Sequence, residues 1–308
     1  MYDVIIVGAG PAGLSAGVYT ARKQLKTLLI AGDIGGQMNN TWGIENWLGF
    51  QFISAPDLIK QFEDHVSKFP IDQKIGSKVS EVKKAAGGFE VITDGGESYQ
   101  AKTILVATGK KPRRLGVPGE NDFTGRGVSY CAICDGPVFT GQRVAVVGGG
   151  NSAIEAVLDL LKIAEHVDLV SLTEITADAV LTDQLKGQKN LTRHIKYNTM
   201  SITGDGLVDS MVIKNMDTST EKRLKVNGIF IEIGLVPNSL PVADIVPLNK
   251  TGEVPISSLN ETVIPGIFAA GDVTNVPEKQ IIIAAGEGAK AALQIHHYLQ
   301  RKQNEIDA

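Results

Sequence analysis

The sequence predicts an α/β fold made of two Rossmann-like, three-layer ββα dinucleotide-binding domains, the second inserted into the first. A glycine-rich turn follows a short apolar strand and opens a helix at two places, Gly8 to Gly13 and Gly148 to Ala153. The length of 308 residues also allows about two domains of roughly 150 residues each. Gly87-Gly88 and the Asp94–Gly96 turn predict the hairpins of a β-meander between the two units.

The first glycine turn belongs to a β-α-β unit at the start of the chain. This unit consists of the apolar run Val4–Val7, the turn, a helix to about Arg22 and a second apolar run, Thr27–Ile30. Gly8 allows the tight turn, Gly10 lets a pyrophosphate approach the backbone, and Gly13 permits close packing of the helix on the strand. Pro11 suits the first helical turn, where its missing N–H has no intrahelical partner.

The second glycine turn has the same context. It lies between the strand Arg143–Val147 and a helix from Ala153 to about Ile163, with a strand following from Val167 to about Leu172. Gly148, Gly150 and Ala153 form the variant G-x-G-x-x-A of the fingerprint. The repetition of a whole β-α-β unit predicts two nucleotide-binding domains.

Turn residues give the domain boundaries. Ala107-Thr108-Gly109 closes a strand and Lys111-Pro112-Arg113 breaks the chain after it, while Gly234–Asn238 closes the strand Gly228–Ile233. The segment Pro255–Gly271 returns to strand character before a long helix from Gln280 to about Gln300. The simplest topology joins residues 1–112 and 241–308 into one discontinuous domain, with 113–240 as the inserted domain.

Composition excludes several classes of protein. A net charge of −4 gives no indication of a nucleic acid or an anionic membrane as partner. The chain has no apolar stretch long enough for a transmembrane helix, and residues 1–7 are typical of a strand and not of a signal peptide. A cytoplasmic location is expected.

The two cysteines of the chain lie three residues apart, at Cys131 and Cys134. A disulfide framework is excluded, and a structural zinc site needs four ligands, for which the five histidines lack a suitable spacing. In a reducing compartment an isolated C-x-x-C indicates a redox couple. Asp135 adjoins the pair and is a candidate for proton transfer during thiol–disulfide exchange.

Two elements near the C-terminus fit a flavin. Gly271-Asp272 follows an apolar strand, so that the carboxylate of Asp272 can accept a hydrogen bond from a ribityl hydroxyl. The helix that begins at Gln280 would direct its positive end at the pyrimidine edge of a reduced flavin. Gly286 and Gly288 lower the helix propensity, which indicates either close approach to a cofactor or partner helix, or no function at all.

The residues after the second glycine turn favour NADH over NADPH. A 2′-phosphate requires arginine or lysine near the end of the following strand, and the stretch Val167–Glu174 has neither. Glu174 or Ser171 is better placed to bind a free 2′-hydroxyl. At the first site the usual strand-end acid is missing, because Ala31-Gly32 stands there.

Together these residues closely resemble the low-molecular-weight thioredoxin reductase family, the class II pyridine nucleotide-disulfide oxidoreductases. The match covers the chain from end to end, through Gly8–Gly13, Gly35-Gly36-Gln37, Ile44–Trp47, Ala107–Gly109, Gly125–Ser129, Cys131–Gly136, Gly271-Asp272 and Gln280. That family also lacks the strand-end acid.

The resemblance implies a homodimer in which electrons pass from NAD(P)H through FAD and the Cys131–Cys134 disulfide to a thioredoxin- or glutaredoxin-like protein. It also implies two domain orientations, with Cys134 facing the flavin in one and Cys131 attacking the partner in the other. The FAD contacts implied by position are Gly8, Gly10, Pro11, Ala12, Gly13, Gly36, Gln37, Asn46, Val79, Ala107, Thr108, Gly109, Gly271, Asp272, Gln280 and Ile281. Those expected for NADH are Gly148, Gly150, Asn151, Ser152, Ala153, Ser171, Glu174, Ile233 and Gly234.

The chain departs from that family at the NADPH site. The family's basic pattern falls on Ser171-Leu172-Thr173 and Ala177, which carry no positive charge. Here the chain resembles the flavoprotein component of bacterial alkyl hydroperoxide reductases, which uses NADH. That likeness extends through Gly148–Ser152, Glu165–Val167, Gly228–Phe230 and Lys279–Ala284. That component carries an N-terminal thioredoxin-fold domain, whereas this sequence starts at the FAD unit, so that a separate protein is expected to receive the electrons.

Two alternatives remain open from the sequence. The same flavoprotein could receive electrons from another donor such as ferredoxin, although the intact turn from Gly148 to Ala153 argues against it. The chain could also be a non-catalytic flavin-binding redox sensor, although the complete pair Cys131–Cys134 with Asp135 favours catalysis.

Overall fold

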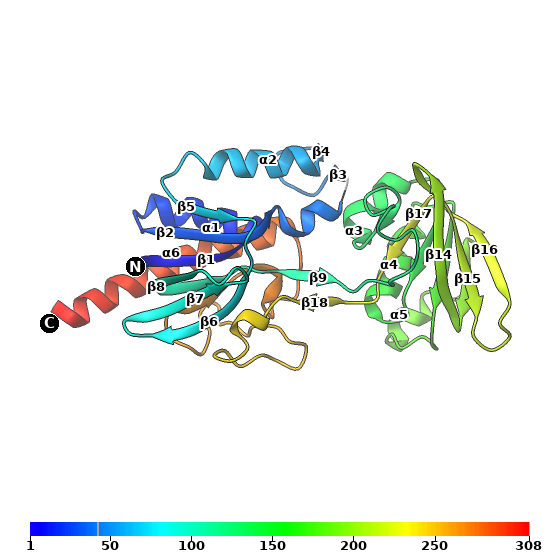
Figure 1. Cartoon of the computed structure of the whole chain (residues 1–308). Helices are drawn as coiled ribbons and strands as arrows, with labels where there is room; N and C mark the ends of the chain where they lie inside the picture. Colours follow the sequence, from blue (N-terminus) through cyan, green and yellow to red (C-terminus); the bar gives the residue numbers. More distant parts are fainter. Residues whose placement is uncertain (42, 308) are drawn as a thin grey trace.

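A computed structural model describes residues 1–41 and 43–307, which form two α/β units side by side (Figure 1). The first unit is built on a seven-stranded sheet of order β5-β2-β1-β8-β7-β6, with β19 paired to β8. Its strands are β1 (Tyr2–Ala9), β2 (Thr27–Ile34), β5 (Asp72–Ile75), β6 (Val79–Ala85), β7 (Gly88–Thr93), β8 (Ser98–Val106) and β19 (Ile267–Ala269). Strands β5, β2, β1, β8 and β19 pair in parallel, and β6, β7 and β8 form the expected antiparallel meander.

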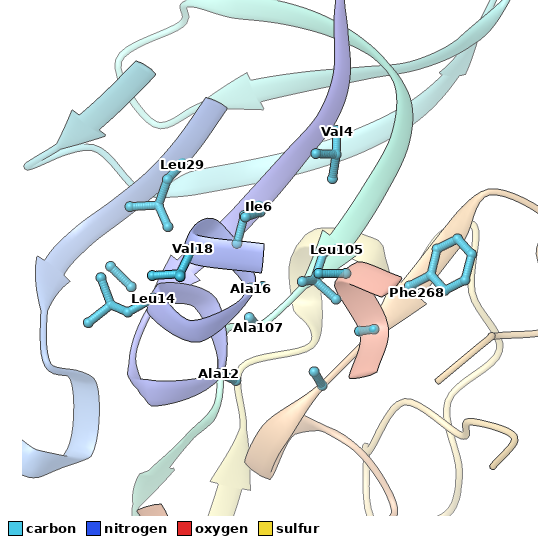
Figure 2. Packing of buried hydrophobic residues seen from close by; sticks show 14 of the residues in the cluster. Val4, Ile6, Ala12, Leu14, Ala16, Val18, Leu29, Leu105, Ala107 and Phe268 are labelled. Carbon is cyan, nitrogen blue, oxygen red and sulfur yellow. The ribbon is translucent and has the colours of Figure 1, made fainter. Parts of the chain in front are cut away.

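Helices cover one face of this sheet. They are α1 (Pro11–Arg22), α2 (Ala55–Val66) and α6 (Ile281–Asp307), and a short hairpin of β3 (Gly43–Ile44) and β4 (Ile53–Ser54) precedes α2. Figure 2 shows Val18 of α1 between Ile6 and Leu29, and Leu14 and Leu105 belong to the same buried cluster. Burial of these side chains, each worth about 1.5–3 kcal/mol, fixes α1 on the sheet. The opposite face is covered by the meander and by residues 242–273.

The second unit has a five-stranded parallel sheet of order β10-β17-β11-β12-β13 and a three-stranded antiparallel sheet of β14, β15 and β16. Its elements are β10 (Val128–Ser129), α3 (Ala132–Asp135), β11 (Arg143–Val147), α4 (Asn151–Leu160), β12 (His166–Ser171), α5 (Ala179–Asp183), β13 (Leu191–Ile195), β14 (Tyr197–Asp205), β15 (Leu207–Asn215), β16 (Glu221–Lys225) and β17 (Gly228–Ile231). One core joins the parallel sheet to the helices and another joins it to β14 and β15. The three-layer ββα fold class is therefore confirmed.

Two short strands connect the units. Strand β9 (Lys110–Pro112) pairs with β18 (Leu235–Pro237), and Figure 1 shows both crossing from one unit to the other. Lys110 Nζ lies 2.6 Å from Glu253 Oε1, which holds β9 to the first unit. The chain passes from one unit to the other at these two strands, which agrees with an inserted second domain. The domain boundaries after residue 112 and before residue 241 stay a prediction.

The structure differs from the sequence-based expectation along Pro255–Gly271. Only Ile267–Ala269 forms a strand there, with isolated bridges from Val254 to Thr274 and from Glu261 to Phe268. Pro255 and Pro265 have no N–H for a strand ladder, which explains the irregular course. The strand expected to end at Ile233 ends at Ile231.

Candidate active site

The first glycine turn has the geometry that the fingerprint requires. A Cβ on Gly8 would lie 2.3 Å from Ala107 O, and one on Gly13 would lie 1.8 Å from Gly8 O, so both positions need glycine. Gly10 is the N-cap of α1, where no side chain of the described residues caps the helix. Apart from Gly10 itself and its two chain neighbours, no atom of residues 1–41 or 43–307 lies within 4 Å of a Cβ placed on Gly10. The N-terminus of α1 thus has no side-chain cap and open space beside Gly10, which suits a pyrophosphate.

Other residues predicted for FAD meet around this turn. A Cβ on Gly36 would lie 3.4 Å from Gly10 Cα, and one on Gly271 would lie 3.0 Å from the Cβ of Ala12. Gln37 Nε2 donates to Asp272 Oδ2 at 2.8 Å, and Asn46 Nδ2 donates to Gln280 Oε1 at 3.0 Å. These two bonds bring together parts of the chain 235 and 234 residues apart.

The Asp272 carboxyl is electrostatically unusual. Its burial raises the pKa, and the charges of Lys279 and Lys110 together with the bond from Gln37 act in the opposite direction. Lys279 itself donates to Thr274 O at 2.7 Å and lies 3.8 Å from Glu253. Two lysines thus stand near the predicted ribityl-binding acid, and no pattern in the sequence indicated either of them.

Thr108 carries a buried hydroxyl without a partner. Its Oγ1 makes no hydrogen bond within the described part of the chain, although it lies between Ala107 and Gly109 at the end of β8. Such a group costs about 1–3 kcal/mol when it stays unpaired. An orphaned donor beside the first glycine turn fits a bound dinucleotide.

Three more residues predicted to contact FAD lie in elements that begin near the first glycine turn or in the core of the first unit. Pro11 opens α1, and Ile281 opens α6 and packs against the small core around Met38 and Ile44. Val79 is buried at the start of β6 among the side chains of the meander. The structure thus places Val79 in the core of the first unit.

Cys131 and Cys134 form a disulfide, with their Cα atoms 5.3 Å apart. Cys131 is the N-cap of α3 and Cys134 lies within that helix. Both cysteines are partly buried, whereas Ile133 between them is 62% exposed. The pair is therefore held in one short helix at the surface of the second unit.

Asp135 is buried next to the disulfide. Ser129 Oγ donates to its Oδ2 at 2.5 Å and accepts the N–H of Cys131 at 3.1 Å, and Thr41 Oγ1 donates to its Oδ1. Burial raises the pKa of the Asp135 carboxyl, and the two hydroxyl donors lower it in part. Since Thr41 belongs to the first unit, this contact holds α3 against β3, as Figure 1 shows.

The second glycine turn repeats the geometry of the first. A Cβ on Gly148 would lie 2.3 Å from Glu232 O, and Gly150 is the N-cap of α4 with no described atom within 4 Å of its would-be Cβ. Asn151 and Asp178 bond reciprocally, from Asn151 Nδ2 to Asp178 Oδ2 and from Asp178 N to Asn151 Oδ1, both at 2.9 Å. Ser152 is exposed beside Gly150, and Ala153 is buried.

The end of β12 carries the residues predicted to select the nucleotide. Ser171 is buried and donates to Thr173 O at 2.8 Å, while Glu174 is exposed. Lys196 Nζ lies 3.8 Å from Glu174 Oε1 and 3.3 Å from Asp217 Oδ2. The fold therefore brings a basic group, Lys196, to this site, which the local sequence does not reveal. Lys196 forms ion pairs with both Glu174 and Asp217.

Ile233 and Gly234 connect β17 to β18. They lie near the second glycine turn because the preceding residue, Glu232, contacts Gly148. Glu232 itself was not identified from the sequence. Its Oε1 accepts the N–H of Ala132 at 3.3 Å, and burial, together with the like charge of Glu155, raises the pKa of its carboxyl to about 7 against the effect of that bond. A second acid thus stands beside the disulfide helix.

Residues 1–41 and 43–307 contain no cluster of three or more His, Cys, Asp or Glu side chains that could hold a metal ion. No helix in this part of the chain is long and apolar enough to cross a membrane.

Known proteins agree with this arrangement. The sequence matches the pyridine nucleotide-disulphide oxidoreductase family over residues 2–288. One component of the alkyl hydroperoxide reductase of Staphylococcus aureus is 42% identical over 301 residues, which make up 97% of this chain and 59% of that protein. The chain thus spans about three fifths of the length of the curated relatives it matches.

Solved structures match over the whole chain. Thioredoxin reductase from Streptococcus pyogenes superposes with a TM-score of 0.92 at 38% identity, covering 98% of this chain and 99% of that one. Lactococcus lactis thioredoxin reductase in its FR conformation gives a TM-score of 0.68 at 34% identity, with 98% and 100% covered. The family implies FAD and a pyridine nucleotide as cofactors. The chain belongs to the pyridine nucleotide-disulphide oxidoreductase family, and within it is a disulfide oxidoreductase of the thioredoxin reductase type.

Proposed function

We propose that this protein transfers electrons from NADH through FAD and the Cys131–Cys134 disulfide to a thioredoxin- or glutaredoxin-like protein. The observation that carries the proposal is the contact between Thr41 and Asp135, because it docks the disulfide helix of one nucleotide-binding unit against the other. The difference in TM-score between two reductases that both cover 98% of the chain supports a second arrangement of the units, in which the dithiol faces a partner.

The residues of the first unit fit FAD. Gly8, Gly10 and Gly13 would receive the pyrophosphate at the N-terminus of α1, and Asp272, held by Gln37, would accept a ribityl hydroxyl. When bound, FAD supplies the two-electron chemistry that links a nicotinamide to a disulfide. The remaining predicted contacts, Pro11, Ala12, Gly36, Asn46, Val79, Ala107, Thr108, Gly109, Gly271, Gln280 and Ile281, belong to the same proposed site.

The Cys131–Cys134 disulfide and Asp135 would carry out the thiol–disulfide exchange. Reduction breaks the Cys131–Cys134 bond with two electrons and takes up two protons to give two thiols. The Cys131 thiolate then attacks the partner's disulfide, and Cys134 resolves the mixed disulfide. Asp135, with its raised pKa and its position after Cys134, would hold or release a proton during this exchange.

The orphaned hydroxyl of Thr108 provides a test of the FAD site. We expect Thr108→Val to stabilise the apoprotein by about 1 kcal/mol, since it removes an unpaired buried donor, and to weaken FAD binding about three- to tenfold. Urea unfolding of the apoprotein and quenching of flavin fluorescence measure the two effects. Thr199→Val is the matched control, because Thr199 Oγ1 in β14 is also buried without a partner among the described residues, far from the first unit in sequence. Equal FAD affinity in both variants would exclude Thr108 as a contact.

The second unit supports NADH as the donor. Ser171, Thr173 and Glu174 stand at the end of β12, where a 2′-phosphate would meet the carboxylate of Glu174. Asp178 adds a further negative charge beside the glycine turn. Lys196 lies near Glu174, but its positive charge is shared with Asp217. Ser171 and Glu174 would bind the ribose, and Gly148, Gly150, Asn151, Ser152, Ala153, Ile233 and Gly234 would line the rest of the site.

Stopped-flow flavin reduction tests this preference. We expect NADH to reduce the flavin at least about tenfold more efficiently than NADPH, because like charges disfavour the 2′-phosphate. Glu174→Arg should raise the efficiency with NADPH by about tenfold, since it replaces a negative charge by a guanidinium that can pair with the 2′-phosphate. Asp183→Arg, an equal change of charge at an exposed acid of α5, should leave the ratio unchanged. Equal rates with both nucleotides would contradict the preference.

The same experiment tests the alternative of another electron donor. A flavin that neither nucleotide reduces would favour another donor such as ferredoxin, and the open turn at Gly150 argues against that result. A non-catalytic sensor would bind its partner without reducing it.

A homodimer and a cytoplasmic location remain part of the proposal. Light scattering of the purified protein would test the dimer. The relatives named for alkyl hydroperoxide reductase are longer than the region matched here, which covers 59% of the Staphylococcus aureus protein.

A further inference from the structure

Glu232 is an acid beside the disulfide that the proposed function does not use. It follows β17, and its Oε1 accepts the N–H of Ala132 at 3.3 Å. Ala132 directly follows Cys131, whose Sγ is four covalent bonds away from that nitrogen. Bond lengths and bond angles along this path therefore keep the Glu232 carboxyl within about 8 Å of the Cys131 sulfur.

The backbone of Glu232 is held in place. Its N–H donates to Val147 O at 2.8 Å, and its carbonyl lies against Gly148, where a Cβ would approach to 2.3 Å. These contacts fix Glu232 to the end of β11 and to the second glycine turn. The position of its carboxyl next to α3 is thus a feature of the fold.

The charges around Glu232 come from two helices. Glu155 on α4 acts on it as a like charge, and burial acts in the same direction, so that its pKa rises to about 7 although the bond from Ala132 lowers it. On the side of α3 the titratable groups are Cys131, Cys134 and Asp135, and Asp135 is bonded to Ser129 and Thr41. Glu232 consequently changes charge near neutral pH.

We propose that Glu232 is a positioning residue that sets the nucleophilicity of the reduced Cys131–Cys134 pair through its charge. This inference depends on the part of the proposed function in which the pair is the redox-active group. The thiolate is the attacking species in disulfide exchange, and a carboxylate nearby disfavours a second negative charge. At about 8 Å and an effective dielectric constant near 20, the repulsion corresponds to roughly a thirtyfold change in the thiolate fraction.

The direction of the effect follows from the charge states. Well below pH 7 Glu232 is neutral, and it leaves the Cys131 thiol undisturbed. Above pH 7 Glu232 is ionised, so it raises the pKa of the thiol and lowers the fraction of thiolate. The reactivity of the wild-type dithiol should therefore rise less steeply between pH 6 and 8 than that of a protein without this charge.

Alkylation of the reduced protein tests the inference without any donor or partner. We expect Glu232→Gln, which keeps an acceptor for the Ala132 N–H, to react with iodoacetamide at Cys131 roughly five- to tenfold faster at pH 8 and equally fast at pH 5.5. The larger thiolate fraction is partly offset because a less basic thiolate is a weaker nucleophile. Peptide mass spectrometry localises the label, and the flavin spectrum and circular dichroism verify the fold. Since only thiols are needed, this result is independent of whether partner reduction or NADH specificity is found.

Two further variants complete the experiment. Glu155→Gln removes the like charge, so the inflection in the wild-type pH profile should move to lower pH; this variant provides the test if Glu232→Gln fails to fold. Glu165→Gln changes an exposed acid of the same unit and should match the wild type. A Glu232→Gln profile that coincides with the wild type, an inflection that stays in place in Glu155→Gln, or an equal gain in Glu165→Gln would overturn the inference.

Discussion

Replacement of Gly288 by alanine should destabilise the protein by about 2–3 kcal/mol, because it forces α6 away from α1. A Cβ at this position would lie 1.9 Å from Ala12 O and 2.7 Å from Ala12 C, which are main-chain atoms that cannot move by a side-chain rotation. The gain in helix propensity of about 1 kcal/mol offsets only part of that cost. Urea unfolding of the apoprotein would measure the loss.

Gly286→Ala is the matched control for this prediction. Outside the backbone of α6 itself and the two chain neighbours, no described atom lies within 4 Å of a Cβ at Gly286, so this variant should be more stable than the wild type by up to about 1 kcal/mol. Gly288→Ala should also bind FAD more weakly, because Ala12 belongs to the first glycine turn. Two alanine variants of equal stability would contradict the close contact between α6 and α1.

Gly286 and Gly288 show that the sequence cannot predict contacts between elements that are distant along the chain. Both lie in the same helix, and the sequence leaves close approach and no function open for each of them. Only the path of α1 across α6 distinguishes Gly288, which touches main chain, from Gly286, which faces open space. Conversely, the roles of Gly8, Gly13 and Gly148 were predictable, because a strand, a turn and a helix in direct succession already define their surroundings.

The surroundings of the disulfide were less predictable for the same reason. Cys131, Cys134 and Asp135 are adjacent in the sequence, and their proximity follows from the spacing. Thr41 is 94 residues from Asp135 and Glu232 is 100 residues from Ala132, so neither contact leaves a local pattern. Lys196 reaches Glu174 in the same way, from the loop between β13 and β14. Side chains that tune a site from another element can be found only once the topology is known.

Replacement of Cys134 by serine should abolish reduction of a thioredoxin- or glutaredoxin-like partner, because no disulfide remains to accept electrons. Reduction of the flavin by NADH should persist, since the glycine turns of both units are untouched. An anaerobic reductive titration should then require one two-electron equivalent less per chain than the wild type.

Comparison with Cys131→Ser distinguishes the roles of the two sulfurs. In Cys134→Ser the Cys131 thiol can still attack an oxidised partner, and without a resolving thiol the mixed disulfide should accumulate on a non-reducing gel. Cys131→Ser should form no such adduct if Cys131 is the attacking residue, and an adduct in Cys131→Ser alone would reverse the assignment. Partner reduction that survives in both variants would show that electrons bypass the pair, and the disulfide relay would have to be abandoned.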